Sequence, residues 1–208
     1  SNPCIVVAGA PNVGKSALIS ALSTGNPEVA SYPFTTKQLH LGHFEHRRLK
    51  YQIVDTPGLL DRPMQERNQI EMQAIAALEH TGSIVLFVMD HSGECGTSIE
   101  EQNNFLNEVK ELLKQKEIVV LETKADLIEI DEKELQEFKS VETNLDYKDY
   151  EENKIKFLRN KSTNNIMIST KEDFGLKSIK FLLINKIKKT QNNDPLELPK
   201  GWYRSDIE

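Results

Sequence analysis

Eight residues near the N-terminus have the types and spacing of a phosphate-binding loop. Residues 9–16 read Gly-Ala-Pro-Asn-Val-Gly-Lys-Ser and match the pattern G-x-x-x-x-G-K-[ST] at every required position. Glycines let the backbone fold closely around phosphate oxygens, and successive N–H groups then point at them. Lys15 would reach the β- and γ-phosphates of a nucleotide, and the Ser16 hydroxyl would bind Mg²⁺. The alternative is a glycine-containing turn that matches the pattern by chance.

Two further stretches have residue types that are found in nucleotide-binding sites. Asp55-Thr56-Pro57-Gly58 directly follows an apolar run, so Asp55 would hold the Mg²⁺ shell and the Gly58 N–H would meet the γ-phosphate. Thr123-Lys124-Ala125-Asp126 resembles the guanine-recognition motif N-K-x-D, with threonine in place of asparagine. The aspartate would accept hydrogen bonds from guanine, whereas adenine would leave this carboxylate poorly paired. Alone, the first stretch is also a good turn sequence, and Asp126 is also a good helix cap.

These stretches define a set of candidate ligand-binding residues. A last short apolar run, 166–168, ends at Ser169, Thr170 and Lys171, whose backbone N–H groups would meet the guanine O6. The predicted nucleotide-binding residues are Gly9, Pro11, Asn12, Val13, Gly14, Lys15, Ser16, Ala17, Asp55, Gly58, Thr123, Lys124, Asp126, Ser169, Thr170 and Lys171.

The elements that must position these residues alternate along the chain. Apolar runs at 4–8, 84–89, 118–121 and 166–168 predict buried strands, and amphipathic stretches at 68–80, 99–115 and 176–187 predict helices. Runs at 37–44 and 49–54 predict an antiparallel hairpin. Each candidate site lies at the carboxyl end of a predicted strand. We therefore expect an α/β fold of the P-loop NTPase type, with a mostly parallel sheet, one antiparallel edge hairpin and helices on both faces.

Other segments carry weaker signals. Residues 24–36 predict a loop, and residues 128–163 predict a solvated excursion with helical pieces at 132–138 and 147–159. We expect one nucleotide-binding domain over 1–190 and a tail over 191–208, whose Trp202 and Tyr203 would pack back on the domain or contact a partner. Histidines of the hairpin are interpreted as ordinary hairpin residues, because co-ligands at metal spacing are absent from the sequence around them.

Composition limits the function classes. The 208 residues carry 28% charged and 38% hydrophobic residues with a formal net charge of −6, typical of a globular domain and not of a protein that coats nucleic acid with a basic surface. Cys4 and Cys95 are far apart in sequence, which predicts a reducing, cytoplasmic location. No apolar run has the length of a membrane span. Ser1 stands where an initiator methionine would be, so we expect the natural chain to extend at its N-terminus.

The chain resembles the GTPase domains of the translation-factor-related class and, within it, the Obg-related family of nucleolar GTP-binding proteins and their archaeal counterparts. The resemblance covers about residues 5–187, poorly over 128–163. It rests on residues 11–16, 32–37 (Tyr-Pro-Phe-Thr-Thr-Lys) and 55–61, and most of all on 66–75 (Glu-Arg-Asn-Gln-Ile-Glu-Met-Gln-Ala-Ile). It implies GTP or GDP with Mg²⁺ as ligands, an N-terminal helical domain that this sequence lacks, and a role in large ribosomal subunit assembly.

The resemblance also implies residue roles. Thr36, in preference to Thr35, would be the switch threonine that closes on Mg²⁺ and the γ-phosphate. Leu59 stands where Ras-like enzymes place a water-orienting glutamine, so we expect slow intrinsic hydrolysis. Asn12 stands where potassium-activated relatives have an asparagine ligand, so K⁺ would supply the missing positive charge. A ribosomal partner, Arg62 or Arg67 would be the alternative.

The expected activity is hydrolysis of GTP to GDP and phosphate as a conformational switch. The expected catalytic set is Asn12, Lys15, Thr36 and Gly58, and the expected metal-binding set is Ser16, Thr36 and Asp55. The alternative is a module that reports GTP or GDP to a partner and hardly hydrolyses; an ATPase is disfavoured by Asp126. Expected partners are ribosomal proteins and RNA of the large subunit, reached mainly through the missing domain, with no membrane and a monomeric state.

Overall fold

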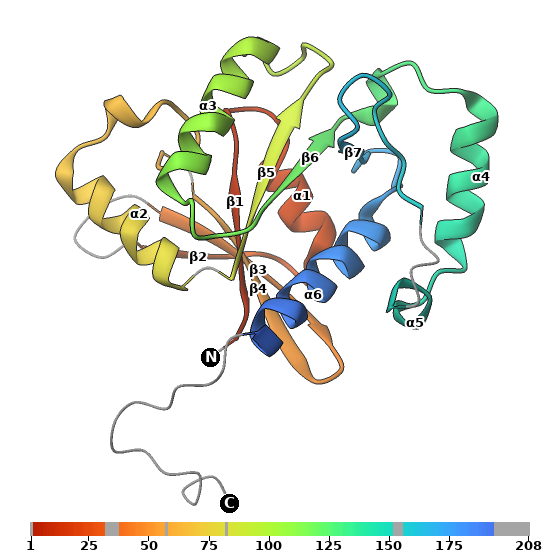
Figure 1. The fold of residues 1–208 in the computed structure, drawn as a ribbon, viewed down its shortest axis with the longest axis horizontal. Helices are drawn as coiled ribbons and strands as arrows, with labels where there is room; N and C mark the ends of the chain where they lie inside the picture. Colours follow the sequence, from red (N-terminus) through yellow and green to blue (C-terminus); the bar gives the residue numbers. More distant parts are fainter. Residues whose placement is uncertain (1, 32–37, 57, 82, 152–155, 194–208) are drawn as a thin grey trace, which may run out of the picture.

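A seven-stranded sheet forms the centre of the molecule. The computed structural model describes residues 2–31, 38–56, 58–81, 83–151 and 156–193. The strand order is β2-β3-β4-β1-β5-β6-β7, and Figure 1 shows helices on both sides of the sheet. The strands are β1 (Cys4–Ala8), β2 (Glu28–Ser31), β3 (Gln38–His46), β4 (Leu49–Asp55), β5 (Ile84–Asp90), β6 (Ile118–Thr123) and β7 (Ile166–Met167).

The helices connect the strands in the predicted alternation. They are α1 (Lys15–Leu22), α2 (Gln69–Thr81), α3 (Ile99–Leu112), α4 (Glu132–Thr143), α5 (Tyr147–Glu151) and α6 (Leu176–Asn193), with short 3₁₀ turns at Met64–Glu66 and Ala125–Leu127. Strand β1 pairs in parallel with β4 and β5, and the parallel pairing continues to β6 and β7. The predicted fold class, a mostly parallel sheet with one antiparallel hairpin and helices on both faces, is confirmed.

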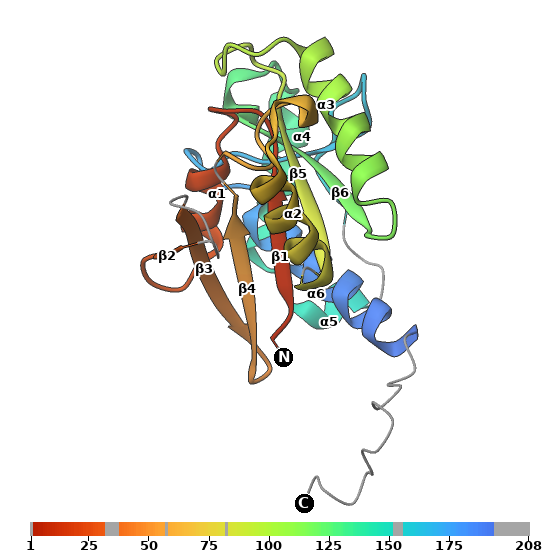
Figure 2. The ribbon, with the colours of Figure 1, turned by 90° about the vertical axis from the view of Figure 1, so that its left-hand side faces the viewer.

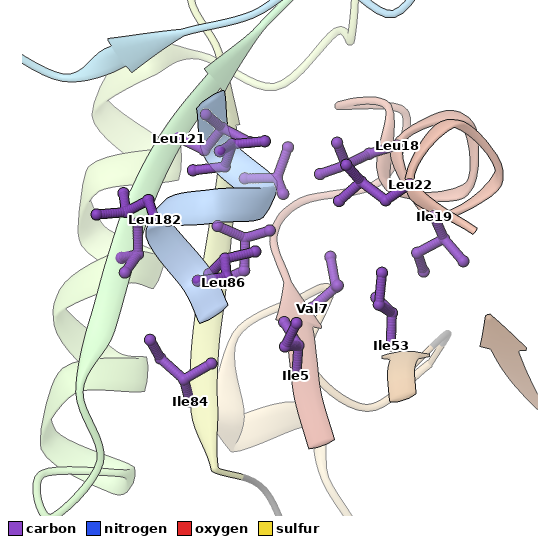
Figure 3. Close-up of a cluster of buried hydrophobic side chains, with 14 of the residues drawn as sticks. Ile5, Val7, Leu18, Ile19, Leu22, Ile53, Ile84, Leu86, Leu121 and Leu182 are labelled. Carbon is purple, nitrogen blue, oxygen red and sulfur yellow. The ribbon is translucent and has the colours of Figure 1, made fainter. Parts of the chain in front are cut away.

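Two apolar layers hold the helices against the sheet. On one face, Ile5 and Val7 of β1 pack with Leu18 and Leu22 of α1 and with Leu182 of α6, as Figure 3 shows. The other face of the same strand packs against α2 and α3. Because β5 is buried at every position, its first six residues read as one continuous apolar run and not as an alternation, and the strand ends on the buried Asp90.

The predicted hairpin is formed by β3 and β4. Their antiparallel register ends at the pair His46–Leu49. Arg47 and Arg48 make the two-residue turn, both with positive φ (50° and 67°), which is the turn geometry that matches strand twist. The hairpin tip lies at the opposite end of the sheet from the loop that follows β1 (Figure 1).

The prediction of a loop over residues 24–36 was wrong in part. Residues Glu28–Ser31 form the edge strand β2, antiparallel to β3. The strand was not predicted because it is short and has polar and turn-forming neighbours. Its backbone pairs with β3, and its Val29 side chain is largely exposed. Residues 32–37 lie outside the described part of the chain.

The prediction of a merely solvated excursion at 128–163 also needs correction. Helix α4 extends to Thr143, beyond the predicted 132–138, and α5 is described only to Glu151. Phe138 and Leu158 form a small core with Met167 and Phe174. Charged residues dominate this stretch, so its few buried apolar side chains give a weak periodic signal. Figure 1 shows α4 on the outer side of β7.

Two of the remaining predictions concern the C-terminal end of the chain, and a third concerns membrane spans. The predicted helix at 176–187 continues to Asn193 as α6, whereas Trp202 and Tyr203 lie outside the described residues. Among the described helices, none combines the length and the apolar character needed to cross a lipid bilayer.

Candidate nucleotide-binding site

The loop between β1 and α1 has the close backbone approach that its glycines predicted. Gly9 has φ of 147°, and a Cβ there would lie 2.4 Å from the carbonyl oxygen of Val88 on β5. Gly14 ends the loop with φ of 103° and precedes α1 directly. A side chain at Gly9 would therefore collide with the neighbouring strand, which explains why the motif needs glycine at this position. Figure 2 shows this end of the sheet from a second direction.

Lys15 is held across the loop by its own backbone. The Lys15 ammonium donates to the carbonyls of Gly9 and Ala10, both at 2.8 Å. Burial lowers the Lys15 pKa, and the negative charges of Asp55 and Asp61 act in the opposite sense. The structure thus places a buried cation at the centre of the loop, as phosphate binding requires.

Ser16 and Asp55, two of the three residues expected to bind Mg²⁺, contact each other. The Ser16 hydroxyl donates to Asp55 Oδ2 at 3.3 Å, although the two residues come from α1 and from the end of β4. The other carboxylate oxygen, Asp55 Oδ1, is buried without a hydrogen-bond partner among the described residues. A buried carboxylate oxygen next to a hydroxyl fits Mg²⁺, which uses few protein ligands and takes the rest from water and phosphate. The described residues contain no group of three or more His, Cys, Asp or Glu side chains suited to an all-protein metal site.

Gly58 and Leu59 follow Asp55 and differ sharply in their surroundings. Gly58 has φ of 76°, and its N–H donates to Asp61 Oδ2 at 2.8 Å. Leu59 is fully buried against α2 and α3, so its side chain does not point at the phosphate end. The predicted switch threonine, Thr36, and its alternative Thr35 lie outside the described residues.

Thr123 and Lys124, from the motif expected to bind the base, contact the loop between β1 and α1. The Thr123 hydroxyl lies 2.5 Å from the Val13 carbonyl oxygen and 3.2 Å from that of Met89. Lys124 has positive φ (55°), and its ammonium donates to the Asn12 carbonyl at 2.7 Å and pairs with Asp90 at 3.0 Å. The threonine that stands in place of the motif's asparagine therefore contacts the loop through its hydroxyl.

Asp126 and Ser169 meet at the carboxyl ends of β6 and β7. The Ser169 hydroxyl donates to Asp126 Oδ1 at 2.6 Å and accepts from the Glu172 N–H at 3.0 Å. The backbone N–H of Ser169 donates to the Phe174 carbonyl, so this N–H is engaged within the chain. Thr170 and Lys171 follow in the turn. The sequence did not predict the bond between Asp126 and Ser169, which orients the carboxylate.

One pocket of about 490 Å³ collects most of the phosphate-end residues. Its lining consists of Pro11, Asn12, Gly14, Lys15, Ser16, Ala17, Asp55, Asp61, Glu94 and Lys124. The predicted residues Gly9, Val13, Gly58, Thr123, Asp126, Ser169, Thr170 and Lys171 are not part of this lining.

Three acidic residues of the site were not among those predicted from the sequence. Asp61 and Glu94 line the pocket, and Asp90 pairs with Lys124. Asp90 had a usable signal, since it ends a buried strand just as Asp55 does. Asp61 lies three residues after Gly58, a spacing at which a carboxylate can reach back to an N–H. Glu94 lies in a polar loop and had no comparable signal.

The fold and this geometry define a P-loop nucleotide-binding domain, and the comparisons with known proteins narrow the class. A model of a family described as 50S ribosome-binding GTPase matches residues 4–124. The chain is 50% identical over 127 residues to an uncharacterized protein of Methanocaldococcus jannaschii, covering 61% of this chain and 35% of that protein. It is 45% identical over 124 residues to nucleolar GTP-binding protein 1 of Drosophila melanogaster, covering 60% of this chain and 19% of that protein.

A solved structure agrees with the sequence relatives. A crystal structure described as that of a nucleolar GTP-binding protein 1 from Plasmodium falciparum superimposes with a TM-score of 0.68 at 34% identity, covering 92% of this chain and 89% of the other. The chain belongs to the 50S ribosome-binding GTPase family and, within it, to the nucleolar GTP-binding proteins. It spans about a fifth to a third of the length of the two sequence relatives described above.

Proposed function

We propose that this domain binds GTP and GDP with Mg²⁺ and hydrolyses GTP as a conformational switch. The observation that carries the proposal is the convergence of Lys15, Ser16 and Asp55 on one pocket, whose lining also includes Lys124. The cation suits phosphate, and the hydroxyl with the buried carboxylate suits the metal that accompanies phosphate. Lys124 lies two residues before Asp126, the residue expected to bind guanine. Membership of a GTPase family supports the same conclusion.

The phosphate end would work through residues that the structure already fixes. Loop N–H groups and the start of α1 offer partial positive charge to the α- and β-phosphates. Lys15 would exchange its two carbonyl contacts for phosphate oxygens, and Ser16 and Asp55 would hold Mg²⁺. Mg²⁺ held by these residues would neutralise part of the phosphate charge.

The base end would select guanine through Asp126. Guanine presents two N–H donors, from N1 and the exocyclic amine, to one carboxylate, and Ser169 holds that carboxylate in place. Lys124 would lay its stem on the base while its ammonium stays bound to Asn12 and Asp90. Because the Ser169 N–H is engaged, Thr170 and Lys171 remain the candidates for contact with the guanine O6.

The hydrolytic step would be attack of water on the γ-phosphorus. An oxygen–phosphorus bond forms, the bond to the bridging oxygen of GDP breaks, and the proton of the water passes to the phosphate product. Gly58 and Thr36 would bind the γ-phosphate, and neither supplies a base. Since Leu59 is buried away from this end, the intrinsic rate would be slow, and K⁺ at Asn12 would supply positive charge.

The cellular role would be in biogenesis of the large ribosomal subunit in the cytoplasm, with ribosomal proteins and RNA as partners. Relatives named nucleolar GTP-binding protein 1 and a family described as 50S ribosome-binding support it. The runner-up is a module that senses GTP and GDP without appreciable hydrolysis. The burial of Leu59 favours this second reading.

Affinity measurements with GTP, GDP and ATP in the presence of Mg²⁺ test the proposal. We expect GTP and GDP to bind and ATP to bind far more weakly. Asp126→Asn should lose guanine nucleotides and gain xanthosine nucleotides, because an amide offers one acceptor and one donor, as xanthine requires. Equal binding of ATP and GTP would contradict the assignment. Single-turnover hydrolysis with and without ribosomal subunits separates the switch from the inert module.

A further inference from the structure

The backbone N–H of Gly58 has an anionic partner inside its own loop. It donates to Asp61 Oδ2 at 2.8 Å. The proposed function assigns this same N–H to the γ-phosphate of GTP. One N–H cannot make a strong hydrogen bond to two anions at once. The Asp61 carboxylate therefore competes with the γ-phosphate for the Gly58 N–H.

Arg67 holds the Asp61 carboxylate in this position. The Arg67 side chain is fully buried, and its Nη2 lies 3.6 Å from Asp61 Oδ1. The same guanidinium donates to the Leu59 carbonyl at 2.7 Å and to the Arg62 carbonyl at 2.8 Å. Arg67 therefore ties the loop backbone to the carboxylate, and it is not aimed at the phosphate end.

Asp61 also faces the pocket. It lines the cavity together with Lys15, Ser16 and Asp55, and its charge acts on the Lys15 ammonium. A nucleoside diphosphate has no γ-phosphate and so does not need the Gly58 N–H as a hydrogen-bond donor. A triphosphate brings additional negative charge toward Asp61 and requires the Gly58 N–H, so it must displace the carboxylate.

The start of this loop is fixed to the phosphate-binding loop. The Gly9 N–H donates to the Leu60 carbonyl at 2.9 Å. Rotation of the Asp61 side chain out of the pocket would break its contact with Arg67, so the change would act on residues 61–67 and not on the segment held by Gly9.

We propose that Asp61 is an internal competitor of the γ-phosphate, which biases the domain toward GDP and whose release from Gly58 reports that GTP has bound. This inference rests on the proposed function. The other reading of the same contact is a local turn that stabilises the loop and does not distinguish the two nucleotides.

Two variants separate these readings. Asp61→Asn keeps an oxygen that can accept from Gly58 but removes the charge, and Asp61→Ala removes both. Asp131→Asn is the matched charge control, because Asp131 caps α4 through the Glu134 N–H and asparagine caps equally well. Equilibrium affinities for GDP and for a non-hydrolysable GTP analogue are measured with Mg²⁺ at one ionic strength. Thermal melting of each variant verifies that it is folded.

We expect the affinity for the GTP analogue, relative to GDP, to rise about tenfold in both Asp61 variants and to stay unchanged in the control. An equal rise for both nucleotides would overturn the inference, since it would show only a general charge effect. An unchanged ratio in either folded variant would also overturn it. If the wild-type domain binds neither nucleotide, the proposed function itself fails, which is a different result from normal binding with an unchanged ratio.

Discussion

The Thr123 hydroxyl and the Val13 carbonyl join the base-binding end of the site to the phosphate-binding loop. Both groups are buried, and the residues are 110 positions apart in sequence. Gly14 packs beside the same side chain, since a Cβ at Gly14 would lie 3.6 Å from Thr123 Oγ1. A single hydroxyl thus ties the motif proposed to bind the base to the loop proposed to bind the phosphates.

Removing this hydroxyl should weaken both stability and nucleotide binding. Thr123→Val keeps the shape but leaves the Val13 carbonyl without its buried donor, which should cost about 1–3 kcal/mol in the free energy of unfolding. Urea denaturation and GDP titration measure the two effects. Thr123→Ser, which keeps the hydroxyl, is the control and should stay close to wild type. A Val variant with unchanged stability and affinity would show that the brace is dispensable.

Asp90 gives the site a dependence on pH. Its carboxylate accepts from the N–H groups of Ser92 (2.8 Å) and Cys95 (2.9 Å) and pairs with Lys124 at 3.0 Å. Burial alone would raise the Asp90 pKa, but the Ser92 hydrogen bonds and Lys124 outweigh it and hold the pKa below its ordinary value of 3.8. Its contribution to stability is therefore present above 3.8 and is lost as the pH falls through the lower pKa of the folded state.

The comparison of wild type with Asp90→Asn tests this pH dependence. The difference in the free energy of unfolding should be largest at neutral pH and should shrink below pH 3.8. Urea midpoints measured across this range supply the values. A difference that stays constant over the range would show that the charge of Asp90 makes no contribution.

Much of this arrangement was predictable, because the strand–loop–helix pattern and the glycine spacing are local properties. The sheet, the phosphate-binding loop and the pair formed by Ser16 and Asp55 followed from them. The contacts of Thr123 and Asp61 depend instead on side-chain geometry across or within loops. The short strand β2 and the small core around Phe138 were missed because their signals come from tertiary pairing and from few apolar residues.

Glu142 shows that the excursion is part of the folded domain. Its side chain on α4 accepts from the Gly175 N–H at 2.7 Å, from the Ser178 N–H at 3.2 Å and from the Ser178 hydroxyl at 2.5 Å. A buried carboxylate thereby caps the N-terminus of α6, where the helix dipole favours negative charge. Glu142→Ala should lower the free energy of unfolding by about 2–3 kcal/mol, and Glu142→Gln by less.

Chemical denaturation of the two Glu142 variants measures this effect. GDP affinity should remain near the wild-type value, because the cap lies outside the nucleotide pocket. The exposed neighbour Glu137→Ala, on the same helix, is the control and should change stability little. A loss no larger than that of the control would mean that α4 and α6 are not coupled through this side chain.

Asn12 offers the last test, which concerns hydrolysis. The backbone carbonyl of Asn12 accepts a hydrogen bond from Lys124. Asn12 is exposed, lines the pocket and has φ of 64°. If K⁺ binds beside Asn12 and neutralises charge that develops during γ-phosphate transfer, single-turnover GTP hydrolysis should be about tenfold or more faster in KCl than in NaCl. Asn12→Ala should abolish the difference while leaving the Lys124 contact, which uses the backbone. Equal wild-type rates in the two salts would exclude K⁺ as the missing catalytic charge and leave a ribosomal partner or Arg62 as the source.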